Sequence, residues 1–403
     1  FGGGLSRYDP VGEKFAHYQN DPEDPNSLSS NLVWSLLEDS TGELWIGTLG
    51  GGLNRLDRES VSGTGAPQYV HYRHVPTDTH SLSDDTVWSL HRDREGVLWV
   101  GTSGGLDRFD PEAEQFSNHP APPIFTVHED REGVLWVGTW DGGLGRLDRE
   151  TGKWAFYQND PSDPHSLGDD SVISLHDDSE GALSAGTLGA GLRRLDREAG
   201  DGQAGRFLRY EHDPADPNSL SHNTILAIHE SPEGVLWIAT GGGGLNRLDL
   251  ATETFRHYRE KDGLPNDTVY GILEDEESAL WLSTNRGLSR FDPRTETFRN
   301  YDVGDGLQSN EFNQGAYSIS PGGEMFFGGV NGFNAFYPEE IQDNPHVPPV
   351  MLTSLTQGGE PVEAGAAVKS LSEVTFRWPR NFFEFEFAAL SYADPEKNEY
   401  AYL

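Results

Sequence analysis

The chain has 403 residues, of which 35% are hydrophobic, with 48 glycines, 24 prolines and no cysteine. This length suffices for a large core and more than one domain, and the lack of cysteine excludes a disulfide framework and any cysteine-ligated metal. The 66 acidic and 29 basic residues give a formal net charge of −37, a field that repels phosphate backbones and argues against nucleic-acid binding.

Neither a run of apolar residues long enough to span a membrane nor a signal peptide is found in the sequence. The chain begins at Phe1, and both of its ends cut through patterned segments. We therefore expect a fragment of a longer protein, in which a membrane anchor would follow the C-terminal end.

The N-terminal stretches "GLSRYD" and "KFAHY" are expected to form a third and a fourth strand without inner partners. The stretch "GELWIGTLGGGLNRLD", residues 42–57, follows them and predicts a strand, a glycine turn and a second strand. A glycine-rich phosphate loop is the alternative, but such a loop opens a helix, and here a strand follows. The glycines are therefore interpreted as turn residues.

The same pattern recurs along the chain about every 40 to 50 residues, a period typical of β-propeller blades. The recurrences are "GVLWVGTSGGLDRFD" at 96, "GVLWVGTWDGGLGRLD" at 133, "GALSAGTLGAGLRRLD" at 181, "GVLWIATGGGGLNRLD" at 234, "SALWLSTNRGLSRFD" at 278 and "GEMFFGGVNGFNAFYP" at 323. Each unit predicts four strands, with an acidic-glycine hairpin between the first two and a tryptophan that packs against the next blade. The fourth unit has Ser184 in place of that tryptophan and is expected to pack loosely.

Seven such units predict an all-β fold with a seven-bladed β-propeller over residues 1–340. The last unit has no obvious fourth strand of its own. Residues 14–18 are expected to supply it and so to cover the bare edge of the last blade.

The repeat, for example "NSLSSNLVWSLLEDSTGELWIGTLGGGLNRLD", resembles the two-component regulator propeller repeat. The C-terminal "NFFEFEFAALSYADPEKNEYAYL" resembles the Y_Y_Y domain, an immunoglobulin-like β-sandwich in which Tyr392, Tyr400 and Tyr402 would be the characteristic tyrosines. We expect this second domain over residues 347–403, truncated at its C-terminal end and joined to the propeller by the stiff, proline-rich "QDNPHVPP".

The resemblance implies the periplasmic or extracellular sensing region of a bacterial inner-membrane receptor, followed by a membrane span and a histidine kinase. It also implies a saccharide ligand, whose binding the Y_Y_Y domain would transmit, and a homodimer in the intact receptor. The fragment itself is expected to be non-enzymatic, without catalytic residues, a metal or a cofactor. A propeller carbohydrate-active enzyme, glycosidase or lyase, and a protein-interaction scaffold are the alternatives.

Ligand binding is expected at the propeller face formed by the turns between second and third strands and by the loops that enter each first strand. The turn residues expected to contact ligand are Trp140, Asp141, Asn285, Arg286 and Asn331. The loop-end residues expected around the same mouth are Asn31, Asp85, Asp170, Asn223, Asp267 and Asn310. A sugar could stack on the tryptophan, and Arg286 could pair with an acidic group on it. Alternatively, Trp140 packs on a neighbouring loop and Arg286 pairs with a protein carboxylate.

Four histidines, His91, His128, His176 and His229, recur at the ends of first strands. They could line a metal or a pH-sensitive site, but the strands of a propeller diverge, while zinc needs ligands at about 2 Å. Ordinary strand-end histidines are the favoured interpretation. Acidic pairs such as Asp84–Asp85 repeat with the blades and are interpreted as turn residues rather than as a glycosidase pair.

Overall fold

The computed structural model describes residues 15–39, 41–57, 67–196, 206–341, 350–362 and 382–389. The chain divides into two compact units, Glu13–Ile341 and a second that joins Phe1–Gly12 with Gln342–Leu403. Among the described residues no helix is long and apolar enough to cross a membrane.

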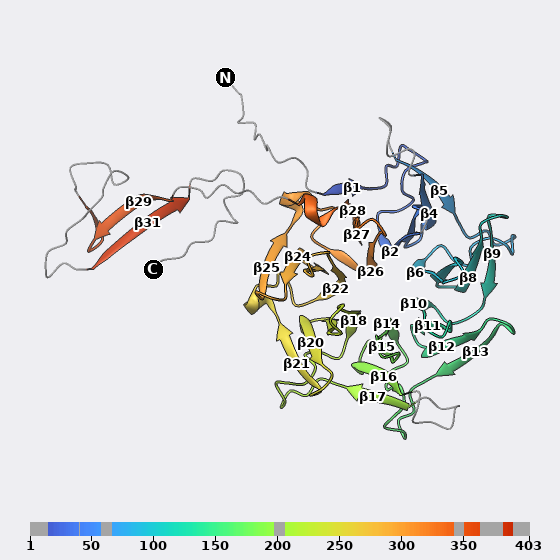
Figure 1. The fold of residues 1–403 in the computed structure, drawn as a ribbon. Coiled ribbons are helices and arrows are strands. Elements are labelled where there is room, and N and C mark those ends of the chain that lie inside the picture. Colours follow the sequence, from blue (N-terminus) through green and yellow to red (C-terminus); the bar gives the residue numbers. More distant parts are fainter. Residues whose placement is uncertain are drawn as a thin grey trace. The chain divides into compact units, whose positions relative to one another are not determined.

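The described part of the larger unit consists of seven four-stranded antiparallel sheets arranged as a ring (Figure 1). Blade 1 contains β2 (Val33–Glu38), β3 (Leu44–Thr48), β4 (Gly52–Asp57) and β5 (Gln68–Tyr72). Blade 2 contains β6 (Val87–Arg92), β7 (Leu98–Thr102), β8 (Gly105–Asp110) and β9 (Gln115–His119). Blade 3 contains β10 (Ile124–Glu129), β11 (Leu135–Thr139), β12 (Leu144–Asp148) and β13 (Lys153–Tyr157).

Blade 4 contains β14 (Val172–Asp177), β15 (Leu183–Thr187), β16 (Leu192–Asp196) and β17 (Arg206–Tyr210). Blade 5 contains β18 (Ile225–Glu230), β19 (Leu236–Thr240), β20 (Leu245–Asp249) and β21 (Thr254–Tyr258). Blade 6 contains β22 (Val269–Glu274), β23 (Leu280–Thr284), β24 (Gly287–Asp292) and β25 (Thr297–Tyr301). Blade 7 contains β26 (Phe312–Ile319), β27 (Met325–Gly329), β28 (Gly332–Phe336) and, from the N-terminal end, β1 (Ala16–Tyr18). Three short 3-10 helices complete the unit: η1 (Glu260–Asp262), η2 (Val303–Asp305) and η3 (Pro338–Glu340).

The first strands of neighbouring blades contact one another around the whole ring, and β2 of blade 1 contacts β26 of blade 7. This agrees with the number of blades expected from the repeats. The predicted closing strand is confirmed, because β1 pairs with β28 in the register Ala16 with Ala335 and Tyr18 with Phe333. The ring is therefore closed by hydrogen bonds between the two ends of the propeller, whereas the expected strand in "GLSRYD" lies outside the described residues.

Five of the seven blades pack against the next through a tryptophan of the second strand. Trp45, for example, is buried in one apolar cluster with Val87, Leu98 and Phe109 of blade 2. Corresponding clusters hold Trp99 against blade 3, Trp136 against blade 4, Trp237 against blade 6 and Trp281 against blade 7.

The hairpin between the first and second strands anchors this tryptophan. In blade 3, Asp130 accepts a hydrogen bond of 2.7 Å from the indole of Trp136, and its other oxygen accepts the backbone N–H groups of Glu132 and Val134. The same carboxylate–indole bond joins Asp39 to Trp45, Asp93 to Trp99 and Asp275 to Trp281. Burial alone would raise the pKa of Asp93, but hydrogen bonds from Trp99 and Val97 and the charge of Arg149 hold it below its usual range.

Blade 4 has no tryptophan to bond to its hairpin carboxylate. Arg194, which lies opposite Ser184 in the neighbouring strand, pairs with that carboxylate, Asp178, and both partners are buried. The equivalent Arg290 of blade 6 pairs with Asp275 beside the indole bond of Trp281, so blade 4 keeps the arginine–carboxylate pair and lacks the indole.

In the smaller unit, β29 (Val350–Gln357) pairs antiparallel with both β30 (Glu360–Pro361) and β31 (Phe383–Ala389). The antiparallel strands agree with the β structure expected for this segment. The immunoglobulin-like sandwich over 347–403 stays a prediction. The proline-rich linker and the three tyrosines proposed as its signature lie outside the described residues.

We predict that Asp130→Ala lowers the free energy of unfolding by about 1–3 kcal/mol, because it leaves the buried indole N–H and two backbone donors without an acceptor. Urea denaturation followed by tryptophan fluorescence measures the loss. Ser231→Ala in blade 5 is the matched control, because Ser231 occupies the same hairpin position beside Trp237 and its hydroxyl accepts a single, long bond of 3.4 Å. Equal losses in both variants would contradict a special role for the carboxylate.

A second prediction concerns ring closure. Phe15 is buried between Tyr301 and Phe336, with ring centroids 5.5 and 4.9 Å away. Phe15→Ala should cost about 3–5 kcal/mol and release β1 from β28. Hydrogen exchange would detect that release as faster exchange of the backbone amides of β28. His17→Ala, at an exposed neighbouring position, removes a surface bond of 2.7 Å to the carbonyl of Asn331 but no buried ring, and should change the exchange of β28 much less than Phe15→Ala does.

Candidate functional site: the mouth of the central channel

In blades 1 to 6 the turns between second and third strands share a threonine that closes them. In blade 3 the hydroxyl of Thr139 donates to the carbonyl of Gly143 at 2.8 Å and accepts the N–H of Gly142 at 2.9 Å. Gly143 has a φ of +87°, and a Cβ there would lie 2.1 Å from the carbonyl oxygen of Tyr157. The Gly-Thr and Gly-Gly pairs of the repeat thus form compact turns, as predicted from the sequence, and bring few side chains to the mouth.

The six loop-end residues hold the inter-blade loops in place. The side-chain oxygen of Asp170 accepts the N–H of Asn159 at 2.6 Å, and its carbonyl accepts the N–H of Gly143 at 2.8 Å. The same pair of bonds, to the start of the loop and to a turn glycine of the preceding blade, is made by Asn31, Asp85, Asn223, Asp267 and Asn310. Their side chains are half-buried and engaged with backbone.

The five turn residues differ in their exposure to solvent and in the hydrogen bonds that their side chains make to the protein. The Asn285 Oδ1 atom accepts a hydrogen bond of 2.8 Å from the Tyr270 hydroxyl, and Asn331 bonds to both the side chain and the backbone of Gln308. Asp141 and Arg286 are exposed, as is Trp140, whose side chain is 47% exposed. Trp140 is packed on one face only, against Phe125, with the ring centroids 5.0 Å apart. The alternative in which it packs on a neighbouring loop therefore holds for part of its surface.

Trp140 ends a row of four aromatic rings that crosses three blades. Phe125 stacks on Trp88 with centroids 4.5 Å apart, and Trp88 meets Trp34 edge to face at 4.9 Å. Trp34, Trp88 and Phe125 are the second residues of β2, β6 and β10, so they project from the innermost strands toward the channel. We call Trp34, Trp88, Phe125 and Trp140 the aromatic arc.

A bulge in β26 lies in the channel beneath the arc. The side-chain amide of Gln314 donates to the carbonyl of Ile173 in blade 4 at 3.1 Å, and Asn313 donates to that of Val33 at 2.8 Å. The register of β26 against β27 shifts between Phe312 and Tyr317 to allow this. A cavity of about 190 Å³ remains, lined by the arc residues of β2, β6 and β10, by Ile173 and by Gln314.

Sequence reasoning found Trp140 but missed the other three rings. Their signal was an aromatic residue at the second position of consecutive first strands, in "LVWSLL", "TVWSLH" and "PIFTVH". An isolated strand pattern predicts a strand but does not reveal which of its faces lines a channel.

The four recurrent histidines lie side by side at the opposite ends of the first strands. The rings of His91 and His128 are 6.1 Å apart, and the Nε2 atom of His229 donates to the carboxylate of Glu274 at 2.8 Å. Burial lowers the pKa of His91 and of His128 to about 4, which favours neutral rings. Within the described ranges no group of three or more histidine, aspartate or glutamate side chains could hold a metal ion.

One buried carboxyl group has the raised pKa of a general acid, but its surroundings are structural. Burial raises the pKa of Asp107, which accepts bonds from Ser83 and Asn118. Asn54 and Asn246 occupy the same place in blades 1 and 5 and accept the corresponding serine N–H. Asp107 therefore fixes a loop rather than facing a second carboxylate.

The buried histidines predict a loss of stability in mild acid. Their pKa values are lower in the folded chain than the 6.5 of an unfolded one, so the unfolded state binds more protons and stability falls as the pH drops from about 6.5 to 4. His91→Leu, which introduces the residue found at the equivalent positions Leu37 and Leu273, should remove about 1–3 kcal/mol of this fall. Urea denaturation at pH 7.5 and 4.5 measures it, and an unchanged pH dependence would contradict the assignment.

Comparison with known proteins shows which family the repeats match. The family model described as two component regulator propeller matches residues 27–50, 81–104, 118–141, 219–242 and 263–286. A curated relative, histidine kinase P4 of Formosa agariphila, is 25% identical over 195 residues, which are 46% of this chain and 14% of the relative.

Two solved structures are similar over most of the chain. The extracellular domain of the putative hybrid two component system BT3049 from B. thetaiotaomicron has a TM-score of 0.71 and 26% identity, covering 95% of this chain and 50% of that one. The extracellular domain of the putative hybrid two component system BT4673 from the same organism has a TM-score of 0.61 and 19% identity, covering 92% and 50%. The chain thus spans about half the length of these structures. It carries two-component regulator propeller repeats, folded as the blades of an all-β propeller.

Proposed function

We propose that the chain is the extracytoplasmic ligand-sensing region of a bacterial signal-transduction receptor. Its relatives support a sensor role, because the similar solved structures are extracellular domains of hybrid two component systems and the curated relative is a histidine kinase. In this proposal the C-terminal unit, as a Y_Y_Y domain, passes the signal across the membrane to a histidine kinase in a homodimeric receptor.

The observation that carries the ligand proposal is the aromatic arc. Its rings present flat apolar faces at the mouth of a channel, and Trp140 leaves about half of its surface open to solvent. Saccharides bind to such faces through their apolar C–H surfaces, while polar side chains at the rim fix the orientation of their hydroxyl groups. We propose a saccharide that stacks on Trp140.

The rim offers polar groups suited to hydroxyls. Asp141 adjoins Trp140, and Asn285 keeps its amide donor available because only its oxygen is bonded, to Tyr270. Arg286 is exposed and could pair with a carboxylate or sulfate on the sugar. Asn331 and the six loop-end residues would contribute chiefly by holding the rim in position, because their side chains already bond to protein.

We predict that Trp140→Ala weakens saccharide binding at least about tenfold, because it removes the exposed stacking face. Isothermal calorimetry of the whole chain against a panel of neutral and acidic oligosaccharides identifies the ligand. The titration is then repeated with Trp140→Ala, Asn285→Ala and Arg286→Ala.

Trp154→Ala is the matched control, because it removes the same side chain from the outermost strand of the same blade. It should leave the affinity unchanged. A ligand whose affinity is unaffected by Trp140→Ala would place its site away from the arc, and a full panel without binding would contradict a saccharide ligand.

A further inference from the structure

The side chains around the channel mouth come from two positions in each of blades 1 to 6. One is the second residue of the first strand, where the register against the second strand shifts in a β-bulge, a feature that redirects a side chain. These bulge residues are, in blade order, Trp34, Trp88, Phe125, Ile173, Leu226 and Tyr270. The other position is the turn residue that follows the closing threonine, which is Leu49, Ser103, Trp140, Leu188, Gly241 and Asn285.

The bulge residue and the turn residue of one blade lie together. In blades 1 to 5 the N–H of the turn residue donates to the carbonyl two positions before the bulge residue, as Trp140 does to Pro123 at 3.0 Å. The two side chains are also in contact in blades 2, 3 and 6, where the pairs are Trp88–Ser103 at 2.9 Å, Phe125–Trp140 at 5.0 Å between ring centroids and Tyr270–Asn285 at 2.8 Å. Two residues of each blade therefore set the chemistry of the mouth.

These pairs divide the mouth into an apolar and a polar sector. In blades 1, 3 and 4 both members of the pair are apolar, and blade 2 adds the indole of Trp88. In blade 6 both members are polar, and Arg286 follows them in the turn. We call the aromatic arc together with Leu49, Ile173 and Leu188 the apolar crescent, which extends over four consecutive blades.

Part of the apolar crescent is open to solvent. The exposed fraction is 47% for Trp140 and 37% for Leu188, the turn residues of neighbouring blades. The hydroxyl of Ser171, in the strand-entry loop of blade 4, donates to the carbonyl of Trp140 and so holds the two blades together at this point. Large apolar side chains exposed next to one another mark a binding surface.

An unsubstituted saccharide would use only part of this surface. Its C–H face packs well on an indole, but its hydroxyl groups need hydrogen-bond partners, which aliphatic side chains such as Leu49 and Leu188 do not provide. An apolar group, in contrast, gains free energy from contact with the same side chains. The aliphatic part of the crescent therefore favours a ligand with an apolar group of its own.

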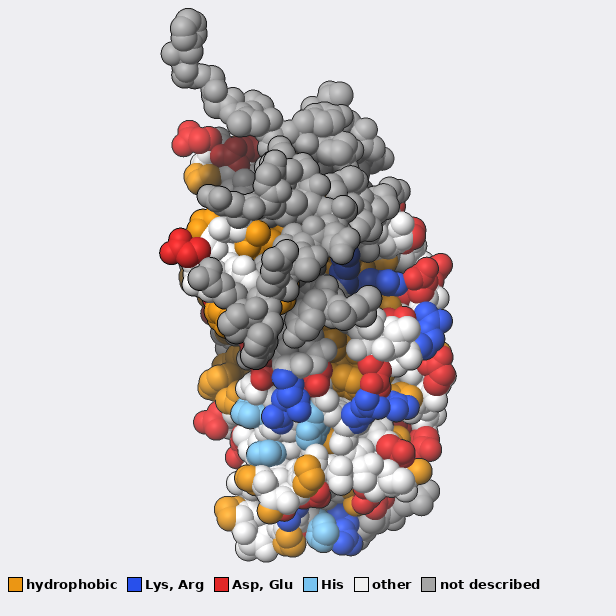
Figure 2. All heavy atoms as spheres, turned by 90° about the vertical axis from the view of Figure 1, so that its left-hand side faces the viewer, with side chains coloured by type: hydrophobic (Ala, Val, Ile, Leu, Met, Phe, Trp, Pro, Cys, Tyr) orange, Lys and Arg blue, Asp and Glu red, His pale blue; other side chains and the backbone are white. Residues whose placement is uncertain are grey.

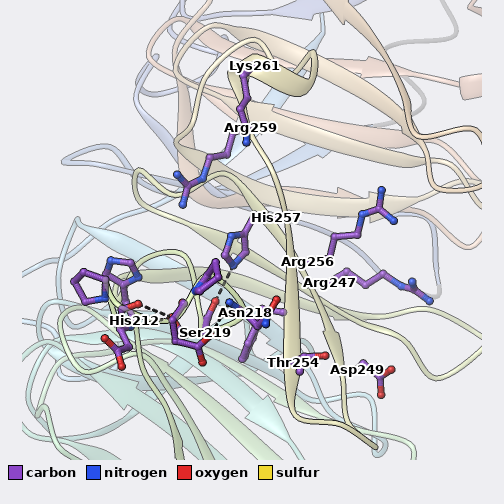
Figure 3. A pocket seen from close by; sticks show the side chains of 15 residues that line it. His212, Asn218, Ser219, Arg247, Asp249, Thr254, Arg256, His257, Arg259 and Lys261 are labelled. Carbon is purple, nitrogen blue, oxygen red and sulfur yellow. Dashed lines mark hydrogen bonds between the residues drawn. The ribbon is translucent and has the colours of Figure 1, made fainter.

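The outer edge of blade 5 is a surface of a different kind. A cavity of about 750 Å³ there is lined by acidic and basic side chains. In Figure 3, Arg247 and Arg256 extend to one side of the strands and His257 and Arg259 to the other, so the cations do not converge on one point. Figure 2 shows basic side chains gathered on the lower part of one face of the molecule. This charged edge offers no counterpart to the stacked rings and leucines of the mouth.

We propose that the ligand of the channel mouth is a saccharide that carries an apolar substituent, an alkyl or aryl group. The sugar ring would stack on Trp140, and the substituent would extend over Leu188 in the next blade. The sugar hydroxyls would meet the amide donors of Asn285, whose oxygen is held by the hydroxyl of Tyr270. This inference rests on the proposed function and narrows the class of its ligand.

Calorimetry of the whole chain with the methyl, hexyl and phenyl glycosides of glucose and of galactose tests the proposal. For each sugar the three probes differ only in the substituent. We expect the hexyl or the phenyl glycoside to bind at least about tenfold more tightly than the methyl glycoside, because it buries additional apolar surface. A preference between hexyl and phenyl would assign the substituent to the alkyl or to the aryl class.

Equal affinity for all three glycosides of a sugar would overturn the proposal but leave saccharide binding, and with it the proposed function, intact. Failure of every glycoside to bind would also overturn it, while the oligosaccharide panel tests the proposed function separately.

Substitutions separate the contribution of the substituent from that of the sugar. Leu188→Ser should weaken binding of the preferred hexyl or phenyl glycoside at least about fivefold and leave that of the methyl glycoside unchanged. Asn285→Ala should weaken all bound glycosides by a similar factor, because it acts on the sugar that they share. Leu208→Ser is the matched control, because Leu208 lies in the outermost strand of the same blade and is 44% exposed. Equal weakening by Leu188→Ser and Leu208→Ser, or no effect of Leu188→Ser, would refute the crescent as the site of the substituent.

Discussion

The contact between the tryptophan of five blades and the sheet that follows each of them is the interaction on which the rest of the propeller depends. A four-stranded blade exposes two faces and cannot bury either of them alone, so its stability comes from its neighbours. The indole supplies a large part of the apolar surface at each junction, and its N–H must find an acceptor in a buried place. The hairpin aspartate six residues earlier provides that acceptor in blades 1, 2, 3 and 6. One short motif thus fixes a turn, orients a ring and joins two blades.

Blades 4, 5 and 7 depart from this motif, and blade 7 has Ser320 and Phe326 at the two positions. Blade 4 keeps the aspartate but lacks the indole, and Arg194 pairs with Asp178. Blade 5 keeps the indole but loses the aspartate, and Arg247 remains exposed at the molecular surface. In blade 4 the buried carboxylate of Asp178 therefore has a partner within the protein. In blade 5, the hairpin serine accepts a bond of 3.4 Å from Val235, and Trp237 stays packed in the apolar cluster that it shares with blade 6.

Much of the fold could be predicted because it repeats. A pattern seen several times defines its strands and turns better than one instance does, and a missing fourth strand in the last unit pointed directly to residues near the N-terminal end. The predicted site was less complete, since a repeat conveys what blades share and a binding site uses what they do not. Asn31 and its equivalents are predictable from the sequence because they recur with the blades, and the bonds that they make are structural and recur in the same way. The stacking of Trp88 on Phe125 could not be predicted, because only the closed ring brings their faces together.

The pairing of β1 with β28 also has a consequence for how the chain is made. Ala16 and Asn334, which bond across this closure, are separated by 318 positions, so β1 is synthesised long before the strand that it pairs with. Until then the inner blades can stack in order as they emerge, but the final sheet lacks its edge and the ring stays open. Closing a loop of this size costs chain entropy that grows only with the logarithm of its length. The ring therefore closes only once blade 7 has been synthesised, and a chain interrupted before blade 7 would leave β1 unpaired.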